Sequence, residues 1–163
     1  MSLRVGVLSV LFLSASAFAS HGGGKHVSID GDWTGGGGWK ATDGTKGKWE
    51  MKSNVKTDKD GMTVKETIVV HAPGAADRKM DSEWTTANLK DGFFDVQVKG
   101  TKVGTGYCGV KQCHISWSDA DGSTEETTSF HKGKVYRIGS HTAKGMTVAW
   151  QGAMAKKGVI RPK

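Results

Sequence analysis

Short stretches of alternating apolar and polar residues run through most of this chain. In residues 48–57, Trp49, Met51 and Val55 share one face while lysines occupy the other. A period of two is typical of a strand that is buried on one face only. Asp58-Lys59-Asp60-Gly61 then has the composition of a turn, and similar segments with Asp-Gly or Lys-Gly turns follow. This pattern indicates an antiparallel meander of short strands.

The expected strands follow one another without a sustained helical period. They cover residues 31–39, 48–57, 62–70, 82–89, 93–99, 102–108, 113–118, 124–131, 134–140 and 146–154. Residues 72–80, which contain Pro73 and Gly74, indicate a longer loop with room for one helical turn. Short turns between strands favour an all-β fold, a single antiparallel up-and-down β-barrel of about 8–10 strands, with a β-sandwich as the alternative. The glycines at positions 35–38 suit barrel closure, where backbones bend and approach closely.

The N-terminal residues have the pattern of a secretion signal. Arg4 precedes an apolar run over residues 5–13, and small residues spaced for a signal peptidase end at Ala19. We expect a signal peptide over residues 1–19 and an exported protein, periplasmic or secreted, because the apolar run is too short to span a membrane. A flexible arm over residues 20–30, a β-barrel domain over 31–155 and a basic tail over 156–163 complete the expected organisation.

The chain is basic, with 23 Lys and Arg against 16 Asp and Glu and a net charge of +7. A positive surface attracts anions, so an anionic envelope polymer is one partner that this composition allows. The lysines are scattered singly, whereas nucleic-acid-binding proteins gather them in one patch or along one helix. We therefore expect no nucleic-acid partner, and the sequence leaves the oligomeric state open.

Both cysteines lie in one short segment that ends at His114. Export favours a disulfide between Cys108 and Cys113, which would face each other across a tight turn and place large residues opposite two strand glycines. The alternative is a widened c-type haem site, with thioether bonds to Cys108 and Cys113 and with His114 as axial ligand. The strand pattern on both sides of the turn favours the disulfide, so we expect neither haem nor metal.

Alternation also predicts which side chains face the inside of the barrel. They are Trp49, Met51, Val55, Met62, Val64, Ile68, Trp84, Phe94, Val96, Val98, Phe130, Tyr136, Ile138, Met146, Val148 and Trp150. Glu66 and Glu126 share their faces with apolar residues, and an inward carboxylate needs water or a buried base. These side chains either fill the barrel or enclose a cavity. Tryptophans beside a few polar groups are typical of small-molecule sites, so the ligand-binding candidates are Trp33, Trp49, Glu66, Trp84, Tyr136 and Trp150.

Gly31-x-Trp33, at the start of an exported β-meander, resembles the lipocalins and the wider calycin superfamily. In lipocalins this Gly-x-Trp lies on the first strand at the closed end of the barrel, capped by an arginine from the last strand. Here the last expected strand, residues 146–154, has no arginine; Arg137 lies one strand earlier and Arg161 lies beyond it. The resemblance implies a barrel that binds a small, largely apolar ligand inside.

No catalytic constellation accompanies these features. No segment resembles a nucleophile elbow, and Glu125 and Glu126 alternate to opposite faces. The histidines outside the cysteine segment (His71, His131 and His141) fall at strand ends, where they are either exposed or gathered at one rim to hold a metal. We therefore expect an exported, non-catalytic, lipocalin-like protein that binds a small apolar or amphipathic ligand. The alternatives are a basic structural or stress-related envelope protein with a filled barrel, and a c-type-like haem protein.

Overall fold

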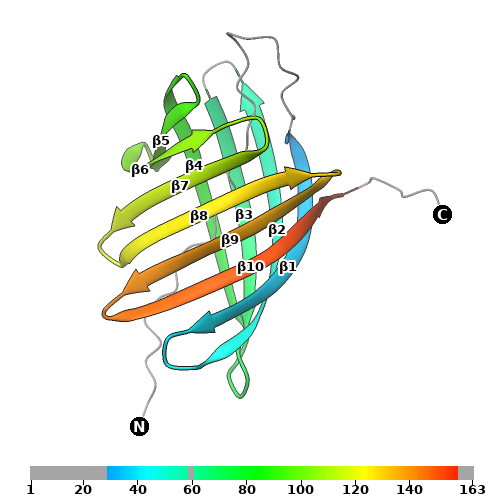
Figure 1. The fold of residues 1–163 in the computed structure, drawn as a ribbon, viewed down its shortest axis with the longest axis vertical. Coiled ribbons are helices and arrows are strands. Elements are labelled where there is room, and N and C mark those ends of the chain that lie inside the picture. The colour runs from blue at the N-terminus through cyan, green and yellow to red at the C-terminus, as the bar shows by residue number, and fades with distance from the viewer. Residues whose placement is uncertain (1–28, 59–60, 158–163) are drawn as a thin grey trace, which may run out of the picture.

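The computed structural model describes residues 29–58 and 61–157, which contain ten strands and no helix (Figure 1). The strands are β1 (Gly31–Ala41), β2 (Lys46–Asp58), β3 (Gly61–His71), β4 (Arg78–Lys90), β5 (Phe93–Val98), β6 (Thr101–Cys108), β7 (Gln112–Asp119), β8 (Gly122–His131), β9 (Lys134–Ala143) and β10 (Met146–Lys156). Their ends agree with those of the expected strands to within three residues, except at β4. This strand begins at Arg78, inside the expected loop, because Arg78 pairs with Val70 of β3.

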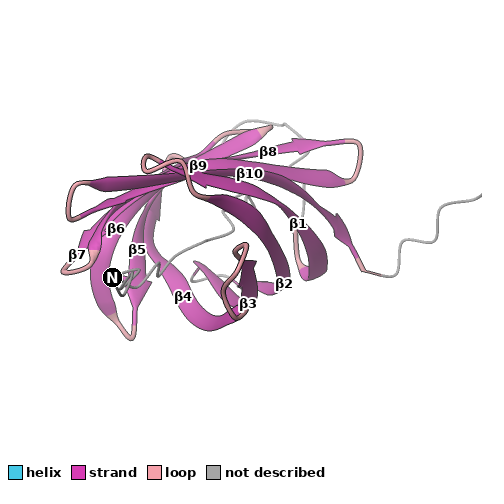
Figure 2. Cartoon of the chain, turned by 90° about the horizontal axis from the view of Figure 1, so that it is seen from below, coloured by secondary structure: helices cyan, strands magenta, loops and turns pink. Residues whose placement is uncertain are grey.

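Every strand pairs antiparallel with the next, and β10 returns to pair with β1. The result is a closed up-and-down barrel, seen from below in Figure 2, where the strands surround a common centre. Closure leaves no free sheet edge, which removes the usual site of edge-to-edge aggregation. The structure thus confirms the barrel and excludes the sandwich.

The glycines of β1 make this closure possible. A Cβ atom at Gly35 would overlap the carbonyl oxygen of Ala153, and a Cβ at Gly37 would overlap that of Gln151, both on β10. On the other side of β1, a Cβ at Gly36 would overlap the carbonyl oxygen of Trp49 on β2. Only glycine permits backbones to approach this closely. The expectation drawn from this glycine run is confirmed.

The cysteine hairpin has the expected register. Cys108 lies opposite Cys113, and their sulfur atoms form a disulfide of 1.99 Å. Gly106 lies opposite Ile115 and Gly104 opposite Trp117, and both large side chains are buried. Thioether bonds to haem would need both sulfurs free, so the structure shows the disulfide alternative.

Several expectations concern residues outside those described. The signal peptide over residues 1–19, nearly all of the expected arm with His21 and His26, and the tail from residue 158 all lie there. The two described residues of the arm precede β1, and Ile29 is already buried in the core, where its carbonyl oxygen accepts a hydrogen bond from Trp33 Nε1 at 2.7 Å. Among the described residues, no helix has the length and apolar character needed to cross a membrane.

Candidate functional site

Five of the six ligand-binding candidates project into the barrel. Trp33, Trp49, Trp84 and Trp150 are between 1% and 5% exposed, and Glu66 is 3% exposed. They come from β1, β2, β4, β10 and β3, so closure brings together residues that are far apart in sequence. Most other side chains predicted to face inward are buried too, whereas Val98, Phe130 and Met146 are only partly buried. The interior of the barrel is therefore packed with side chains.

Tyr136, the sixth candidate, lies on the outer face of β9 and is 42% exposed. Ile138 also points outward, at 60% exposed, while Val135 and Arg137 point inward and are buried. The prediction for this strand was wrong by one residue, which exchanges the two faces of a strand completely. Arg137 takes the inner position because the barrel offers it two buried carboxylates.

A buried charge cluster occupies the middle of the barrel. Arg137 Nη2 donates to Glu126 Oε1 at 2.7 Å and to Oε2 at 2.8 Å, and Nε donates to Oε1 at 3.0 Å. Arg137 Nη1 lies 3.8 Å from Glu66 Oε1, and all three side chains are fully buried. Trp150 Nε1 donates to the second oxygen of Glu126 at 3.0 Å. The expectation that an inward carboxylate needs a buried base is confirmed, and the base is Arg137.

Burial raises the pKa of Glu126 from 4.5 to about 7, because the charged form is poorly solvated in the core. The charge of Arg137 acts in the opposite direction, as do the hydrogen bonds from Trp150 and Thr128. The raised pKa therefore means that desolvation disfavours the charged carboxylate more than Arg137 and the hydrogen bonds favour it. Alternation in the sequence predicted that both glutamates face inward. Two buried acidic groups imply a buried base, and this requirement was the one sign in the sequence that pointed to Arg137.

One of the three histidines outside the cysteine segment differs from expectation. His141 is buried at 2% exposed, and its Nδ1 lies 2.8 Å from Thr124 Oγ1 inside the barrel, so it is neither an exposed residue nor part of a rim cluster. Among the described residues, no group of three or more His, Cys, Asp or Glu side chains is arranged to hold a metal ion. His114 points outward, with its Nε2 2.8 Å from Glu125 Oε2 and its Nδ1 3.1 Å from Thr127 Oγ1. It therefore belongs to a polar network that links β7 to β8.

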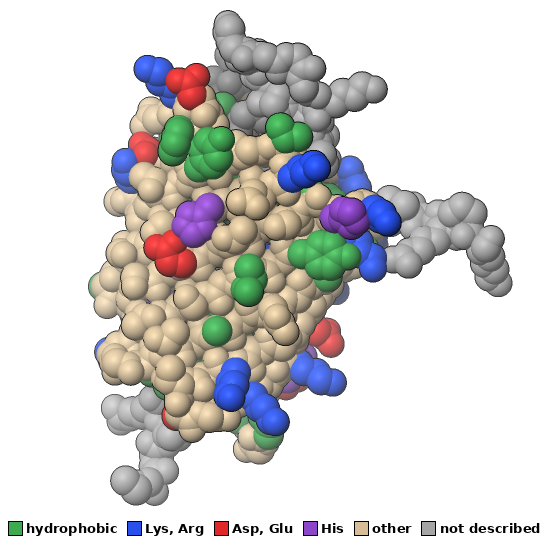
Figure 3. Space-filling model, viewed as in Figure 1, with side chains coloured by type: hydrophobic (Ala, Val, Ile, Leu, Met, Phe, Trp, Pro, Cys, Tyr) green, Lys and Arg blue, Asp and Glu red, His purple; other side chains and the backbone are tan. Residues whose placement is uncertain are grey.

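Charged side chains are spread over the outer surface of the barrel. Figure 3 shows one face, on which basic and acidic groups lie in several small clusters separated by uncharged surface. Several lysines pair with acids, such as Lys65 with Glu83 at 3.0 Å and Lys102 with Asp95 at 2.6 Å. This distribution agrees with the single scattered lysines of the sequence.

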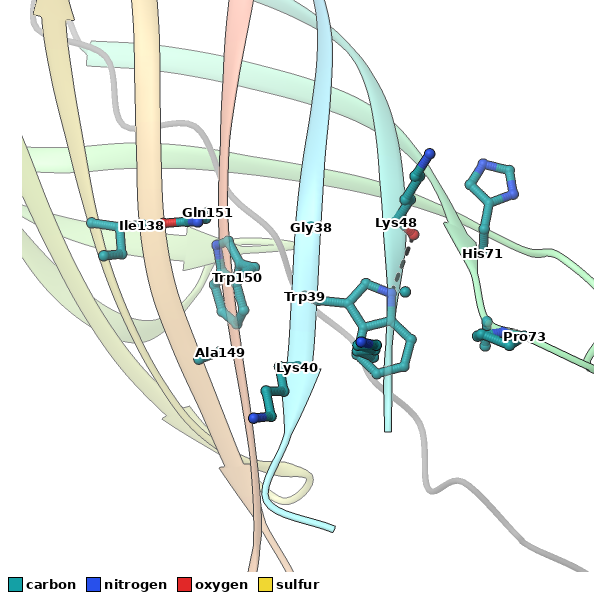
Figure 4. A pocket seen from close by; sticks show the side chains of 13 residues that line it. Gly38, Trp39, Lys40, Lys48, His71, Pro73, Ile138, Ala149, Trp150 and Gln151 are labelled. Carbon is teal, nitrogen blue, oxygen red and sulfur yellow. Dashed lines mark hydrogen bonds between the residues drawn. The ribbon is translucent and has the colours of Figure 1, made fainter. Parts of the chain in front are cut away.

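A hollow of about 840 Å³ lies near the β1–β2 hairpin (Figure 4). We call it the end hollow. It is lined by residues of five strands and of the β3–β4 connection: Gly38, Trp39, Lys40, Lys46, Gly47, Lys48, His71, Ala72, Pro73, Ile138, Ala149, Trp150 and Gln151. Of the six ligand-binding candidates, only Trp150 is among them.

Two tryptophans from neighbouring strands define the wall of the end hollow. Trp39 of β1 lies opposite Trp150 of β10, and the Trp39 indole nitrogen donates to the carbonyl oxygen of Lys48 at 3.2 Å, as Figure 4 shows. Trp39 is partly exposed, whereas Trp150 is buried and held by Glu126. The charge cluster thus holds the Trp150 side chain on the inner face of the barrel, whereas Gly38 faces outward.

Gly38 leaves open space in the same hollow. A Cβ at this position would meet only the carbonyl oxygen of Gly47, at 3.7 Å, which is ordinary van der Waals contact. Gly38 therefore differs from Gly35, Gly36 and Gly37, where no side chain fits. The expectation from the glycine run was closure alone, and it did not identify Gly38 or Trp39 as site residues.

No protein-family model matches the chain, and no curated protein matches it. Among solved structures, the chain is similar to the S-type phycobiliprotein lyase CPES from Guillardia theta, with 8% identity, 83% of this chain and 90% of that chain covered, and a TM-score of 0.65. At this identity the likeness shows the fold alone. A candidate AttH protein from Nitrosomonas europaea aligns with a TM-score of 0.30 and 10% identity, over 89% of this chain and 60% of that one, and carries no argument. The resemblance to lipocalins therefore holds for the closed barrel architecture, without a family match to lipocalins in particular.

Proposed function

We propose that the protein binds one small, largely apolar molecule in the end hollow and does not transform it. The observation that carries this proposal is the open space over Gly38 on the outer face of the barrel, where Gln151 and Ile138 are its neighbours across two strand pairs. Its volume of about 840 Å³ falls within the range of small-molecule sites, which is roughly 300–1,000 Å³. Aromatic and aliphatic groups line it together with a few polar ones, as is usual for such sites.

The lining residues support binding without catalysis. None of them carries a hydroxyl, thiol or carboxyl group, and their one imidazole, on His71, is engaged by Asp77 at 2.8 Å. Nucleophilic catalysis needs a nucleophile beside a base, and a general acid–base pair needs two groups with opposed roles. The end hollow offers amines, an amide and apolar surface instead.

We also propose that the protein is exported. The charged, apolar and small-residue segments at positions 1–19 support this, as does the disulfide between Cys108 and Cys113, because disulfides persist in oxidising compartments. The intact mass of the protein purified from its own source tests the proposal. Loss of the first 19 residues is the expected result, and an uncleaved N-terminus would contradict it.

The second candidate function is a structural envelope protein that binds an anionic polymer. The packed interior favours it, because the side chains that point inward leave the barrel filled. In this case the exposed lysines bind the polymer together, and binding does not depend on the end hollow. Small-molecule binding that depends on Gly38 distinguishes the first candidate from the second.

A neutral fluorescent probe, N-phenyl-1-naphthylamine, tests the proposed function. We expect saturable one-to-one binding, with quenching of tryptophan fluorescence that is smaller in a Trp39→Phe variant. Gly38→Leu places a side chain in the hollow, and its Cβ makes only ordinary contact with the backbone at Gly47, so it should weaken binding by about tenfold or more. Thr34→Leu is the matched control, since Thr34 is exposed on the same strand and does not line the hollow. Absence of saturable binding, or equal loss in both leucine variants, would overturn the proposal.

A further inference from the structure

Three lysines project around one side of the end hollow. Lys40 of β1 lies directly opposite Lys46 of β2, and Lys48 follows on the same face of β2. All three side chains are exposed. No acidic residue is among those that line the hollow. This part of the surface is therefore positive next to an apolar wall.

These lysines are unlike the others that the fold places near acids. Lys65, Lys79 and Lys102 pair with carboxylates at 3.0, 3.2 and 2.6 Å. Within the described ranges 29–58 and 61–157, neither Lys40, Lys46 nor Lys48 makes such a pair. Like charges directly opposite each other in an antiparallel pair destabilise the sheet. The Lys40–Lys46 pair thus carries a repulsion that an anion would relieve.

The acidic groups nearest the hollow surround His71, which lies directly opposite Lys48 on the neighbouring strand β3. Asp77 Oδ1 is 2.8 Å from His71 Nδ1, and Glu50 Oε1 is 3.8 Å from its Nε2. These carboxylates disfavour an anion beside the imidazole. The charged end of a ligand is therefore best placed at Lys40 and Lys46, away from His71, with its body over Gly38 and against Ile138.

We propose that the end hollow selects a small organic anion, whose apolar body lies over Gly38 and against Ile138 and whose carboxylate or sulfonate binds the amines of Lys40 and Lys46. This inference rests on the proposed function and adds the charge of the ligand to it. Hydrogen bonds to charged groups are stronger than neutral ones, so the amines would distinguish an anion from a neutral molecule of the same shape. The apolar wall gives affinity, and the lysines give selectivity.

Two probes with the same ring system test the selectivity. 8-Anilinonaphthalene-1-sulfonate carries a sulfonate that N-phenyl-1-naphthylamine lacks. We expect the sulfonate to bind about tenfold more tightly at low ionic strength, and this advantage should shrink at high salt because exposed charges are screened. The double variant Lys40→Gln/Lys46→Gln should lose most of the advantage while keeping its affinity for the neutral probe. Lys52→Gln/Lys56→Gln is the matched control, since it removes the same charge from exposed positions of β2 that do not line the hollow.

The outcomes separate the two proposals. If both probes bind equally and the Lys40/Lys46 variant changes neither, the anion selectivity is wrong and the proposed function stands. If the control pair lowers sulfonate affinity as much as the Lys40/Lys46 pair, the effect is that of overall charge and the selectivity is again wrong. If neither probe binds saturably, both proposals are wrong.

Discussion

Arg137 joins opposite walls of the barrel through its side chain. Glu126 comes from β8 and Glu66 from β3, and these strands stand on opposite sides of the ring of ten. Removing one partner of a buried ion pair leaves an uncompensated charge in the core, which costs about 3–5 kcal/mol. We therefore expect Arg137→Ala to lower the free energy of unfolding by this amount in urea denaturation. The triple variant Glu66→Leu/Glu126→Leu/Arg137→Met should recover most of the loss, and no recovery would contradict this account.

Glu126 gives the protein a defined pH dependence. Its pKa is about 7 in the folded protein and near 4.5 when unfolded, so the folded state holds an extra proton between these pH values. The contribution of this proton to stability is full below about pH 4.5 and is lost as the pH rises through 7. The loss is at most about 3 kcal/mol. Urea denaturation of the wild type should give a lower free energy of unfolding at pH 8 than at pH 5. The same difference measured for Glu126→Gln reports the other titrating groups, and it should be smaller by the contribution of Glu126.

The four consecutive glycines of β1, residues 35–38, differ in whether a side chain would fit at their positions. A Cβ at Gly37 would overlap the backbone of Gln151, whereas a Cβ at Gly38 would have ordinary contacts only. We expect Gly37→Ala to destabilise the barrel by about 2–3 kcal/mol through overpacking between β1 and β10. Gly38→Ala should be neutral or stabilise by about 0.5 kcal/mol, because alanine reduces the freedom of the unfolded chain. Equal midpoints for the two variants in urea would refute the close approach at Gly37.

Individual strands were predictable to different degrees from the sequence. β2 shows its inner face directly, because Trp49, Met51 and Val55 alternate with exposed lysines. The inner face of β9 was predicted wrongly, because its apolar Tyr136 and Ile138 point outward and the charged Arg137 points inward. Alternation assumes that apolar side chains face the core. That assumption fails where a buried acid on a neighbouring strand compensates a buried base.

At the scale of the whole molecule, the ring of strands was predictable and the end hollow was not. Alternation and short turns specify an antiparallel meander, and closure follows from the need to protect its edges. The hollow depends on an absent side chain at Gly38 and on its neighbours across two strand pairs, Gln151 and Ile138. These residues are at least a hundred positions beyond Gly38 in the sequence, so only the register of the closed barrel brings them together.

The up-and-down order also separates the disulfide from the end hollow. Successive turns alternate between the two ends of such a barrel, so the β1–β2 turn and the β6–β7 turn lie at opposite ends. The disulfide closes a short loop between Cys108 and Cys113, so its loss should cost only about 2 kcal/mol.

We therefore expect Cys108→Ser/Cys113→Ser to unfold at lower urea, to keep its β-sheet circular dichroism, and to bind the naphthyl probes as the wild type does. A changed affinity would contradict the independence of the two ends.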